Sequence, residues 1–96
     1  MTITKTEKDN TVTLELDGWL DTLTAPELKK EYEALDKGIE GLVLDMEKLQ
    51  YVSSAGIRQL ILICKEMKDK FSIKNASDEL MDIFHITGVD RIVRFE

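Results

Sequence analysis

Hydrophobic and polar residues alternate along residues 11–21 of the chain. One face of this stretch carries Val12, Leu14, Leu16, Gly18 and Leu20, and the other carries Thr13, Glu15, Asp17, Trp19 and Asp21. A period of two residues is typical of a half-buried strand. The pair Asp9-Asn10 favours a tight turn, so strands at residues 3–6 and 11–17 are predicted to form a hairpin.

A helical spacing of apolar residues begins after this hairpin. Leu28, Tyr32 and Leu35 recur at i, i+4 and i+7, behind the segment TAPE at residues 24–27. That segment predicts a capping box in which the Thr24 hydroxyl caps the helix, and Gly38 is the predicted stop. Pro in the first turn fits because its missing donor has no partner there.

Two further helices follow at residues 54–70 and 78–88. The second helix is predicted by the apolar stripe Ile57, Leu60, Ile61, Cys64 and Met67, and the third by Leu80, Ile83, Phe84 and Thr87 on its buried face. Acidic residues stand in the first turn of the third helix, where negative charge suits the helix dipole. Gly88 is predicted to end it.

The remaining apolar runs predict the later strands. Residues 42–46 are continuously apolar apart from Asp45, which is typical of a central strand covered on both faces. Residues 71–75 and 92–95 predict a short strand and a final edge strand. The order ββαβαβαβ indicates one α/β domain over residues 1–96, with a mixed sheet whose N-terminal hairpin is followed by parallel strands and right-handed crossover helices.

Composition narrows the function classes. The chain has 13 Lys and Arg against 19 Asp and Glu, a net charge of −6, which argues against direct binding to nucleic acid or to an anionic membrane surface. No apolar run approaches the roughly 20 residues of a membrane span, and the polar start resembles no signal peptide, so no membrane insertion is expected. The single cysteine, Cys64, lies on an apolar stripe, where a buried thiol is expected, and favours a reducing compartment. The sequence predicts a cytoplasmic domain.

The loops after parallel strands meet at one edge of a sheet. Residues 18–24, 47–54 and 75–78 are expected there, with Trp19, Asp21, Thr22, Tyr51, Ser53, Ser54, Asn75 and Ser77. They contain no glycine-rich phosphate loop and no cluster of metal ligands, so no cofactor or metal is predicted. The only histidine, His85, is predicted in the third helix, away from this edge.

Ser54 stands where a strand is predicted to give way to the second helix. On structural grounds alone, Ser54 is predicted to be the N-cap of this helix. A phosphoryl group there would also meet free N–H groups and the positive end of the helix dipole, and Gly56 would leave the first turn open to a large partner. Phosphorylation would add about −1.5 to −2 charge beside Asp21 and Asp45. The site is therefore a candidate for regulation as well as a cap.

Other side chains near this edge have two interpretations each. Trp19 either packs on a helix or anchors a partner, and Leu23 would extend such an anchor. Arg58 is either a solvated charge or a partner for a carboxylate or a phosphate on Ser54. Tyr51 is expected in the core. A triad of Ser54, His85 and an Asp would require close approach of distant elements, and the G-x-S-x-G elbow is absent, so no enzyme is predicted.

In combination, several motifs resemble the STAS family, the domain shared by sulfate transporters and bacterial anti-sigma-factor antagonists. The resemblance covers nearly the whole chain and is strongest to the small stand-alone antagonists. Its motifs are LDG at residues 16–18, LD at 20–21, TAP at 24–26, LVLD at 42–45, YVSSAGI at 51–57 and ITGV at 86–89.

The resemblance implies a phospho-switch without enzymatic activity. In the family, the unphosphorylated antagonist binds an anti-sigma factor and frees a sigma factor. The anti-sigma factor is often a serine kinase that phosphorylates the antagonist with ATP, and a PP2C-type phosphatase reverses this. The acceptor matches Ser54, and the acidic residue beside it matches Asp21. The expected partner surface comprises Trp19, Asp21, Leu23, Ser53, Ser54, Ala55, Gly56 and Arg58.

The sequence departs from the family pattern around the acceptor. Many phosphorylated members have Asp, Ser, then Ser or Thr, then Gly, whereas here Ser53 replaces the Asp and Ala55 replaces the second hydroxyl residue. Ser54 is favoured over Ser53 as the acceptor because it fits the predicted N-cap position. The alternative function is a STAS subunit that docks constitutively in a transport or signalling assembly without phosphorylation.

Overall fold

The computed structural model describes residues 1–96 and contains a five-stranded mixed sheet in the order β1-β2-β3-β4-β5. The strands are β1 (Thr2–Lys8), β2 (Thr11–Leu20), β3 (Gly41–Val52), β4 (Phe71–Lys74) and β5 (Arg94–Phe95), and the helices are α1 (Ala25–Glu33), α2 (Ser54–Met67) and α3 (Asp78–Thr87). β1 is antiparallel to β2, and every other pair is parallel. The predicted order ββαβαβαβ is confirmed.

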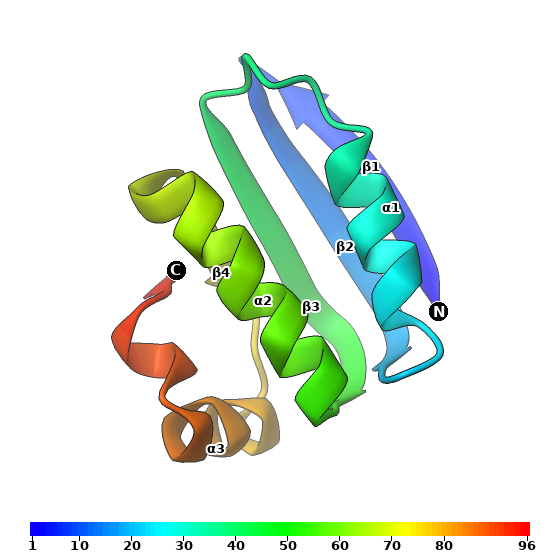
Figure 1. Ribbon diagram of the computed structural model, residues 1–96, viewed down its shortest axis with the longest axis vertical. Helices are drawn as coiled ribbons and strands as arrows, with labels where there is room; N and C mark the ends of the chain where they lie inside the picture. The colour runs from blue at the N-terminus through cyan, green and yellow to red at the C-terminus, as the bar shows by residue number, and fades with distance from the viewer.

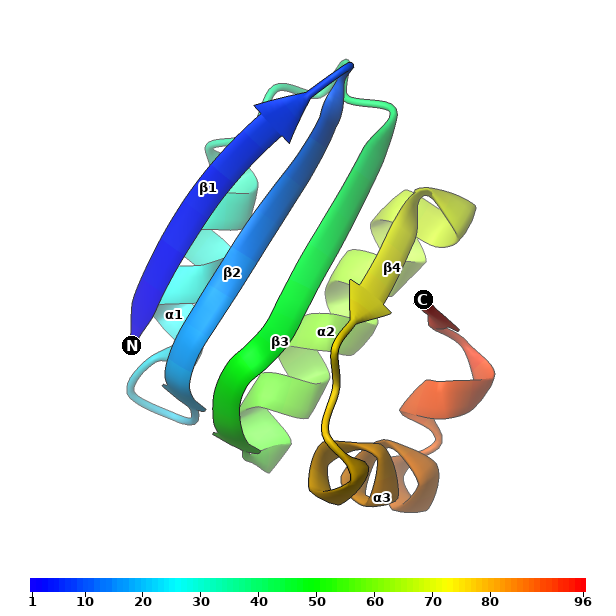
Figure 2. The same cartoon turned by 180° about the vertical axis from the view of Figure 1, so that it is seen from behind.

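The helices lie on one side of the sheet. α1 and α2 cover the same face (Figure 1), α3 lies beyond the end of β4, and the opposite face carries no helix (Figure 2). Each new parallel strand is added on the same side of the last one, so crossovers of one hand place their helices on a single face. The expectation that β3 is covered on both faces is therefore wrong, and Val43 on its open face is only half-buried.

The core fills the space between the sheet and the helices. Its fully buried side chains include Leu14, Leu16, Leu20, Leu28, Leu42, Leu44, Leu60, Ile63, Ile73 and Phe84. Alternation along β2 sends Val12 and the leucines into this core and turns the side chains between them to the open face. Cys64 is buried as predicted, and its thiol donates to the Ile92 carbonyl at 3.0 Å. Thr87, predicted on the buried face of the third helix, is exposed.

Several boundaries differ from the prediction. α1 ends at Glu33, well before Gly38, because the chain leaves the helix at Ala34 to carry Leu35 and Ile39 into the core. The Thr24 hydroxyl makes no capping bond to this helix. The hairpin is longer than predicted, and its turn residues Asp9 and Asn10 have φ of 52° and 64°, the conformation that tight hairpin turns require.

Two register irregularities bend the long central pair of strands. They lie between Glu15 and Asp17 and between Gly18 and Trp19 of β2, where β3 contributes extra residues. Such bulges allow pairing to continue past a local kink. β3 therefore runs on to Val52, so that most of the predicted loop at residues 47–54 is strand.

Candidate functional site

The ends of β2 and β3 bring the connection to α1 beside the start of α2. The backbone amide of Ser53 donates to the Leu20 carbonyl at 2.8 Å, so the two segments are joined at this point. Residues 21–24 follow Leu20 directly, and α2 begins at Ser54. The structure thus places Asp21 and Leu23 on the segment next to the serine pair, as expected at the carboxyl ends of parallel strands.

Ser53 is the N-cap of α2. Its backbone is extended, with φ −92° and ψ 176°, and its hydroxyl accepts a hydrogen bond from the Gly56 amide at 3.4 Å. Ser54 is the first helical residue, and its hydroxyl is exposed and has no hydrogen-bond partner. The predicted cap at Ser54 is therefore wrong by one position. The choice of Ser54 over Ser53 as a phosphate acceptor rested on that cap and stays a prediction.

Gly56 faces the sheet. A Cβ atom at this position would lie 2.8 Å from Leu20 Cγ and Val52 Cγ2, and 2.9 Å from the Leu20 carbonyl oxygen. Carbon atoms do not approach this closely, so the glycine lets the first turn of α2 pack on the ends of β2 and β3. The expectation that Gly56 opens the first turn to a partner is therefore wrong. Gly56 instead allows the close packing that determines the position of Ser54.

Asp21 organises the connection between β2 and α1. Its carboxylate accepts from the amides of Leu23 at 3.0 Å and Thr24 at 3.1 Å. Burial acts to raise the pKa of Asp21, but hydrogen bonds from the Thr24 amide and hydroxyl and from the Leu23 amide, together with the charge of the N-terminal ammonium, outweigh it, and the pKa lies below its usual value. The Thr24 hydroxyl donates to the Trp19 carbonyl at 2.6 Å and accepts from the Asp21 amide at 2.8 Å, so it holds this loop instead of capping α1.

Residues 75–78, the third segment predicted to lie at this edge of the sheet, are not next to the serine pair. β4 ends early, and the Asn75 side chain donates to Asp45 Oδ1 at 3.1 Å. Asp45 is a nearly buried residue inside β3, far along the strand from Val52. Asp45 is therefore not part of the charge around Ser54. Ser77 caps α3, since its hydroxyl accepts from the Leu80 amide at 3.2 Å.

Trp19 and Tyr51 form a pair on the open face of the sheet. They are register partners at the ends of β2 and β3, with ring centroids 5.9 Å apart in an edge-on arrangement. The Trp19 indole N–H donates to Gln50 Oε1 at 3.0 Å. Trp19 and Tyr51 are 55% and 45% exposed, so neither the expectation that Tyr51 lies in the core nor the packing of Trp19 on a helix is correct.

Sequence reasoning missed Tyr51 and Gln50 as surface residues of this region. The signal that could have found Tyr51 is its position immediately before Val52, the last apolar residue before the helix. Successive side chains of one strand point to opposite faces, so a residue directly before a buried one is expected on the open face. Leu23, the third apolar side chain here, is 85% exposed.

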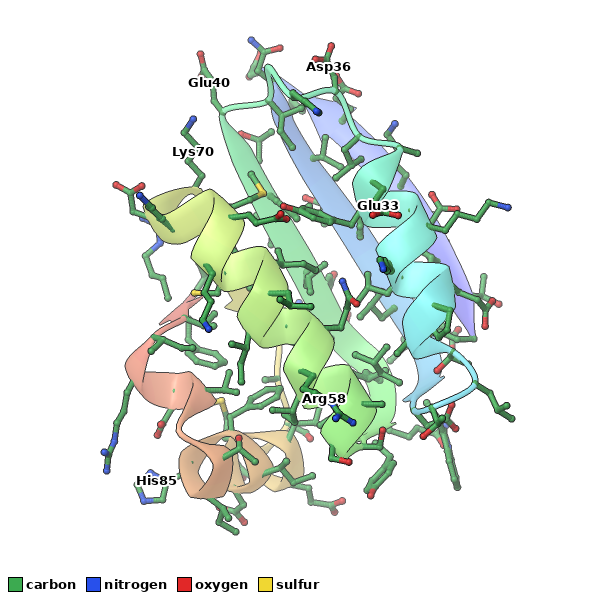
Figure 3. All side chains as sticks on the ribbon, in the orientation of Figure 1. Glu33, Asp36, Glu40, Arg58, Lys70 and His85 are labelled. Carbon is green, nitrogen blue, oxygen red and sulfur yellow. The ribbon has the colours of Figure 1, made fainter.

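The candidate residues Arg58 and His85 lie on different helices, Arg58 on α2 and His85 on α3. Arg58 extends from the first half of α2 (Figure 3) and has no carboxylate partner within ion-pair distance. Lys48 pairs with Glu15 at 3.4 Å, and His85 Nδ1 forms a hydrogen bond with Asp90 Oδ2 at 2.9 Å. His85 lies toward the end of α3 and bonds to Asp90, so it does not form a triad with Ser54. No group of three His, Cys, Asp or Glu side chains is placed to hold a metal ion.

A surface groove lies away from Ser54, between α1 and α2. Its volume is about 580 Å³, and Tyr32 and Glu66 are among the residues that line it. Burial, followed by the hydrogen bond from the Tyr32 hydroxyl to Glu66 at 2.7 Å, raises the pKa of Tyr32 to about 12. None of the helices is long and apolar enough to span a membrane.

Known proteins resemble the chain in sequence and fold. The family model of the STAS domain matches residues 2–96. The chain is 29% identical over 92 residues to the "Putative anti-sigma factor antagonist BtrV" of Bordetella bronchiseptica, covering 92% of this chain and 79% of that protein.

Solved structures share the architecture. An anti-sigma factor antagonist from Mycobacterium paratuberculosis superposes with a TM-score of 0.87 at 21% identity, covering 98% of this chain and 83% of that one. The anti-sigma factor antagonist SpoIIAA in its unphosphorylated form gives 0.81 at 17% identity, covering 99% and 88%. SpoIIAA of Bacillus in its phosphorylated form gives 0.74 at 17% identity, covering 99% and 91%. With a family match over residues 2–96 and the same order of strands and helices, the chain belongs to the STAS domain family.

Proposed function

We propose that this protein is an anti-sigma factor antagonist that binds an anti-sigma factor through the surface around the start of α2 and is switched by phosphorylation of Ser54. One observation carries the proposal: Ser53 holds the helix cap, while the hydroxyl of Ser54 next to it is exposed and unbonded. A kinase could reach this oxygen without breaking the cap. The sequence relative named as an antagonist supports the choice of partner class.

The switch follows from charge. When a kinase transfers the terminal phosphoryl group of ATP, a bond forms between Ser54 Oγ and phosphorus, ADP leaves and the hydroxyl proton is released. The phosphoserine carries about −1.5 to −2 charge at the start of α2, next to the segment that contains the ionised Asp21. A doubly charged group inside a packed protein interface is expected to weaken binding, because its desolvation is costly.

The remaining parts of the proposal concern the partners. The anti-sigma factor is a serine kinase that uses ATP, and a PP2C-type phosphatase restores the binding form. The protein itself catalyses no reaction, requires no cofactor, contacts neither nucleic acid nor the membrane interior directly, and acts in the cytoplasm. The partner surface consists of Trp19, Asp21, Leu23, Ser53, Ser54, Ala55 and Arg58, with Gly56 acting beneath it by positioning the helix.

A second candidate is a constitutive docking subunit of a transport or signalling assembly. The observation that favours it is Ser53, which stands where many phosphorylated members have Asp and which here is committed to the cap. A kinase that reads the Asp would then fail to recognise this chain.

Intact mass after incubation with a candidate anti-sigma kinase and ATP separates the two candidates. We expect a gain of one phosphate that is lost in Ser54→Ala and retained in Ser53→Asn, since Asn keeps an N-cap while removing the other hydroxyl. Binding of the kinase without any gain in mass would contradict the switch and favour constitutive docking.

A further inference from the structure

The groove between α1 and α2 is lined by a buried side-chain amide that has no partner in the protein. Gln59 is only 9% exposed, and neither its amide nitrogen nor its amide oxygen bonds to another residue. Native proteins keep few polar groups in this state, because an unpaired polar group away from water is costly. The amide is not sealed in the core, since the one fully buried and unpaired side-chain atom of the molecule is Asp90 Oδ1. Because Gln59 lines the groove, its amide opens into it.

The two helical walls of this groove are joined to each other. Gln59, Leu62 and Glu66 recur at i, i+3 and i+7 along α2, so they share the face of that helix that lines the groove. Tyr32 lines it from α1, and its hydroxyl donates to Glu66 Oε1 at 2.7 Å. The helices diverge towards their C-terminal ends (Figure 1), and this bond connects them. The walls are therefore in position before a ligand binds, which lowers the entropic cost of binding.

The groove has the size and the apolar lining of a small-molecule site. Its volume of about 580 Å³ falls within the range of roughly 300–1,000 Å³ that is typical of such sites. Leu35 and Ile39, which line it, belong to the core, whereas Leu62 is 54% exposed and Met67 is half-buried. Ligand sites usually combine apolar walls of this kind with a few polar groups that fix the orientation of the ligand. Gln59 is placed to be such a group.

The charged side chains that line the groove balance one another. They are three lysines and three carboxylates: Lys29, Lys37, Lys70, Glu33, Asp36 and Glu66. Figure 3 shows Glu33 and Asp36 at the end of α1 and Lys70 beyond the end of α2, so both signs of charge are present along the groove. The formal charges cancel here, although the whole chain carries −6. A lining without net charge favours a neutral ligand over an anion or a cation.

We propose that the groove binds a small neutral molecule that carries a carboxamide or a lactam on an apolar or aromatic body. A carboxamide presents a donor beside an acceptor, and the Gln59 amide presents the complementary acceptor and donor, so two hydrogen bonds can join them. A ligand with an acceptor alone would leave the Gln59 oxygen unpaired. The body of the ligand contacts Tyr32 and Leu62. The site involves neither Ser54 nor the anti-sigma factor, so it does not rest on the proposed function.

Titration of the isotope-labelled full chain with benzamide, followed by NMR, tests the site. We expect saturable binding in the millimolar range, as suits a ligand of this size, with shifts at the Gln59 side-chain amide and at the backbone amides of Tyr32 and Leu62. Acetophenone keeps the ring and the carbonyl group but lacks the N–H donor, and benzoate is charged. Each of these two should bind at least about 5-fold more weakly than benzamide, because the Gln59 oxygen stays unpaired.

A variant of Gln59 separates a ligand-binding role from a structural one. Gln59→Leu removes the amide at similar size and should weaken benzamide binding by about 5-fold or more. It should leave the free energy of unfolding unchanged or raise it, because no hydrogen bond within the protein is lost. Gln50→Leu is the matched control, since Gln50 lies outside the groove and bonds to Trp19. Its affinity for benzamide should equal that of the unaltered protein.

Several results would overturn the amide site. Equal affinities for benzamide and acetophenone would show that hydrogen bonding to Gln59 does not select the ligand. A Gln59→Leu protein that is less stable than the unaltered one would make the amide a structural group. Shifts confined to residues outside the groove, or no saturable binding up to the solubility limit of benzamide, would also contradict the proposal. None of these results bears on the phosphorylation of Ser54, so the proposed function is tested separately.

Discussion

Two adjacent serines at the start of α2 have different physical roles. Ser53 is extended and caps the helix through the Gly56 amide, whereas Ser54 is helical and its hydroxyl is free. An N-cap needs a non-helical backbone so that its oxygen can turn back to the helix amides. The structural and the proposed regulatory functions are therefore divided between neighbouring residues.

This division predicts different stabilities for two alanine variants. Ser53→Ala should lower the free energy of unfolding by about 1 kcal/mol, the usual loss for an N-cap. Ser54→Ala should leave it nearly unchanged, since no bond is lost. Urea denaturation of both variants measures the difference, and equal effects would contradict the assignment of the cap.

Gly56 is the residue at which an added methyl group should be most costly. Gly56→Ala places its Cβ within 3 Å of Leu20 and Val52, so we expect a loss of about 1–3 kcal/mol through overpacking. Gly38→Ala is the control, because its Cβ would meet only the flexible Asp36 side chain at 3.4 Å. Chemical denaturation of both variants tests this, and a Gly56→Ala protein as stable as the unaltered one would refute it.

At the scale of elements, the connection from β2 to α1 is held by Thr24. Thr24→Val should lower the free energy of unfolding by about 1–3 kcal/mol, because the Asp21 amide and the Trp19 carbonyl both lose their partner. Thr24→Ser keeps the hydroxyl and is the matched control. If Val and Ser variants melt at the same temperature, the hydroxyl does not hold this loop.

The contact between α1 and α2 includes a titratable group. Tyr32 has a pKa of about 12 in the fold, above its usual value of 10.0, so the folded state retains this proton where the unfolded state loses it. Stability from this group is complete below about pH 10 and declines as the pH rises through about 12. The difference in stability between the unaltered protein and Tyr32→Phe should therefore shrink over this range. Denaturation at pH 9 to 12 measures it, and a constant difference would contradict the raised pKa.

The local elements were largely predictable because each has its own period. The alternation along β2 and the apolar stripe of α2 are visible in the residues, since one face of each packs on the core. The ends of elements were less predictable. α1 ends before its predicted glycine, and Thr24 does not cap it, because burial of Leu35 and the demands of the Asp21 loop outweigh local capping preferences.

For the whole molecule, the one-sided arrangement of helices determines which surface is available to partners. α1 and α2 occupy one face, and the other face presents β-strand side chains directly (Figure 2). Trp19, which sequence reasoning placed between two interpretations, lies on that open face beside Tyr51. The proposed partner surface therefore curves from the end of the sheet onto its open face instead of being confined to the loops.

The fold determines where the acidic residues that give the net charge of −6 lie relative to Ser54. The sequence suggested that Asp21 and Asp45 would both lie near Ser54. The structure keeps Asp21 on the neighbouring segment and places Asp45 in β3 against Asn75. The local density of charge depends on which strands are adjacent and where each strand ends. The spacing of acidic residues along the chain contains neither piece of information.

The sequence by itself determined the order ββαβαβαβ, the core faces of β2 and α2, the buried Cys64 and the resemblance to the STAS family, because these follow from periods and motifs within short segments. Only the tertiary structure decided which serine caps α2, why Gly56 lacks a side chain, and that Tyr51 pairs with Trp19 on an uncovered face. These features depend on bulges, on the register between β2 and β3 and on the approach of α2 to Leu20. Each is set by packing between residues distant in the chain, and local patterns do not contain that information.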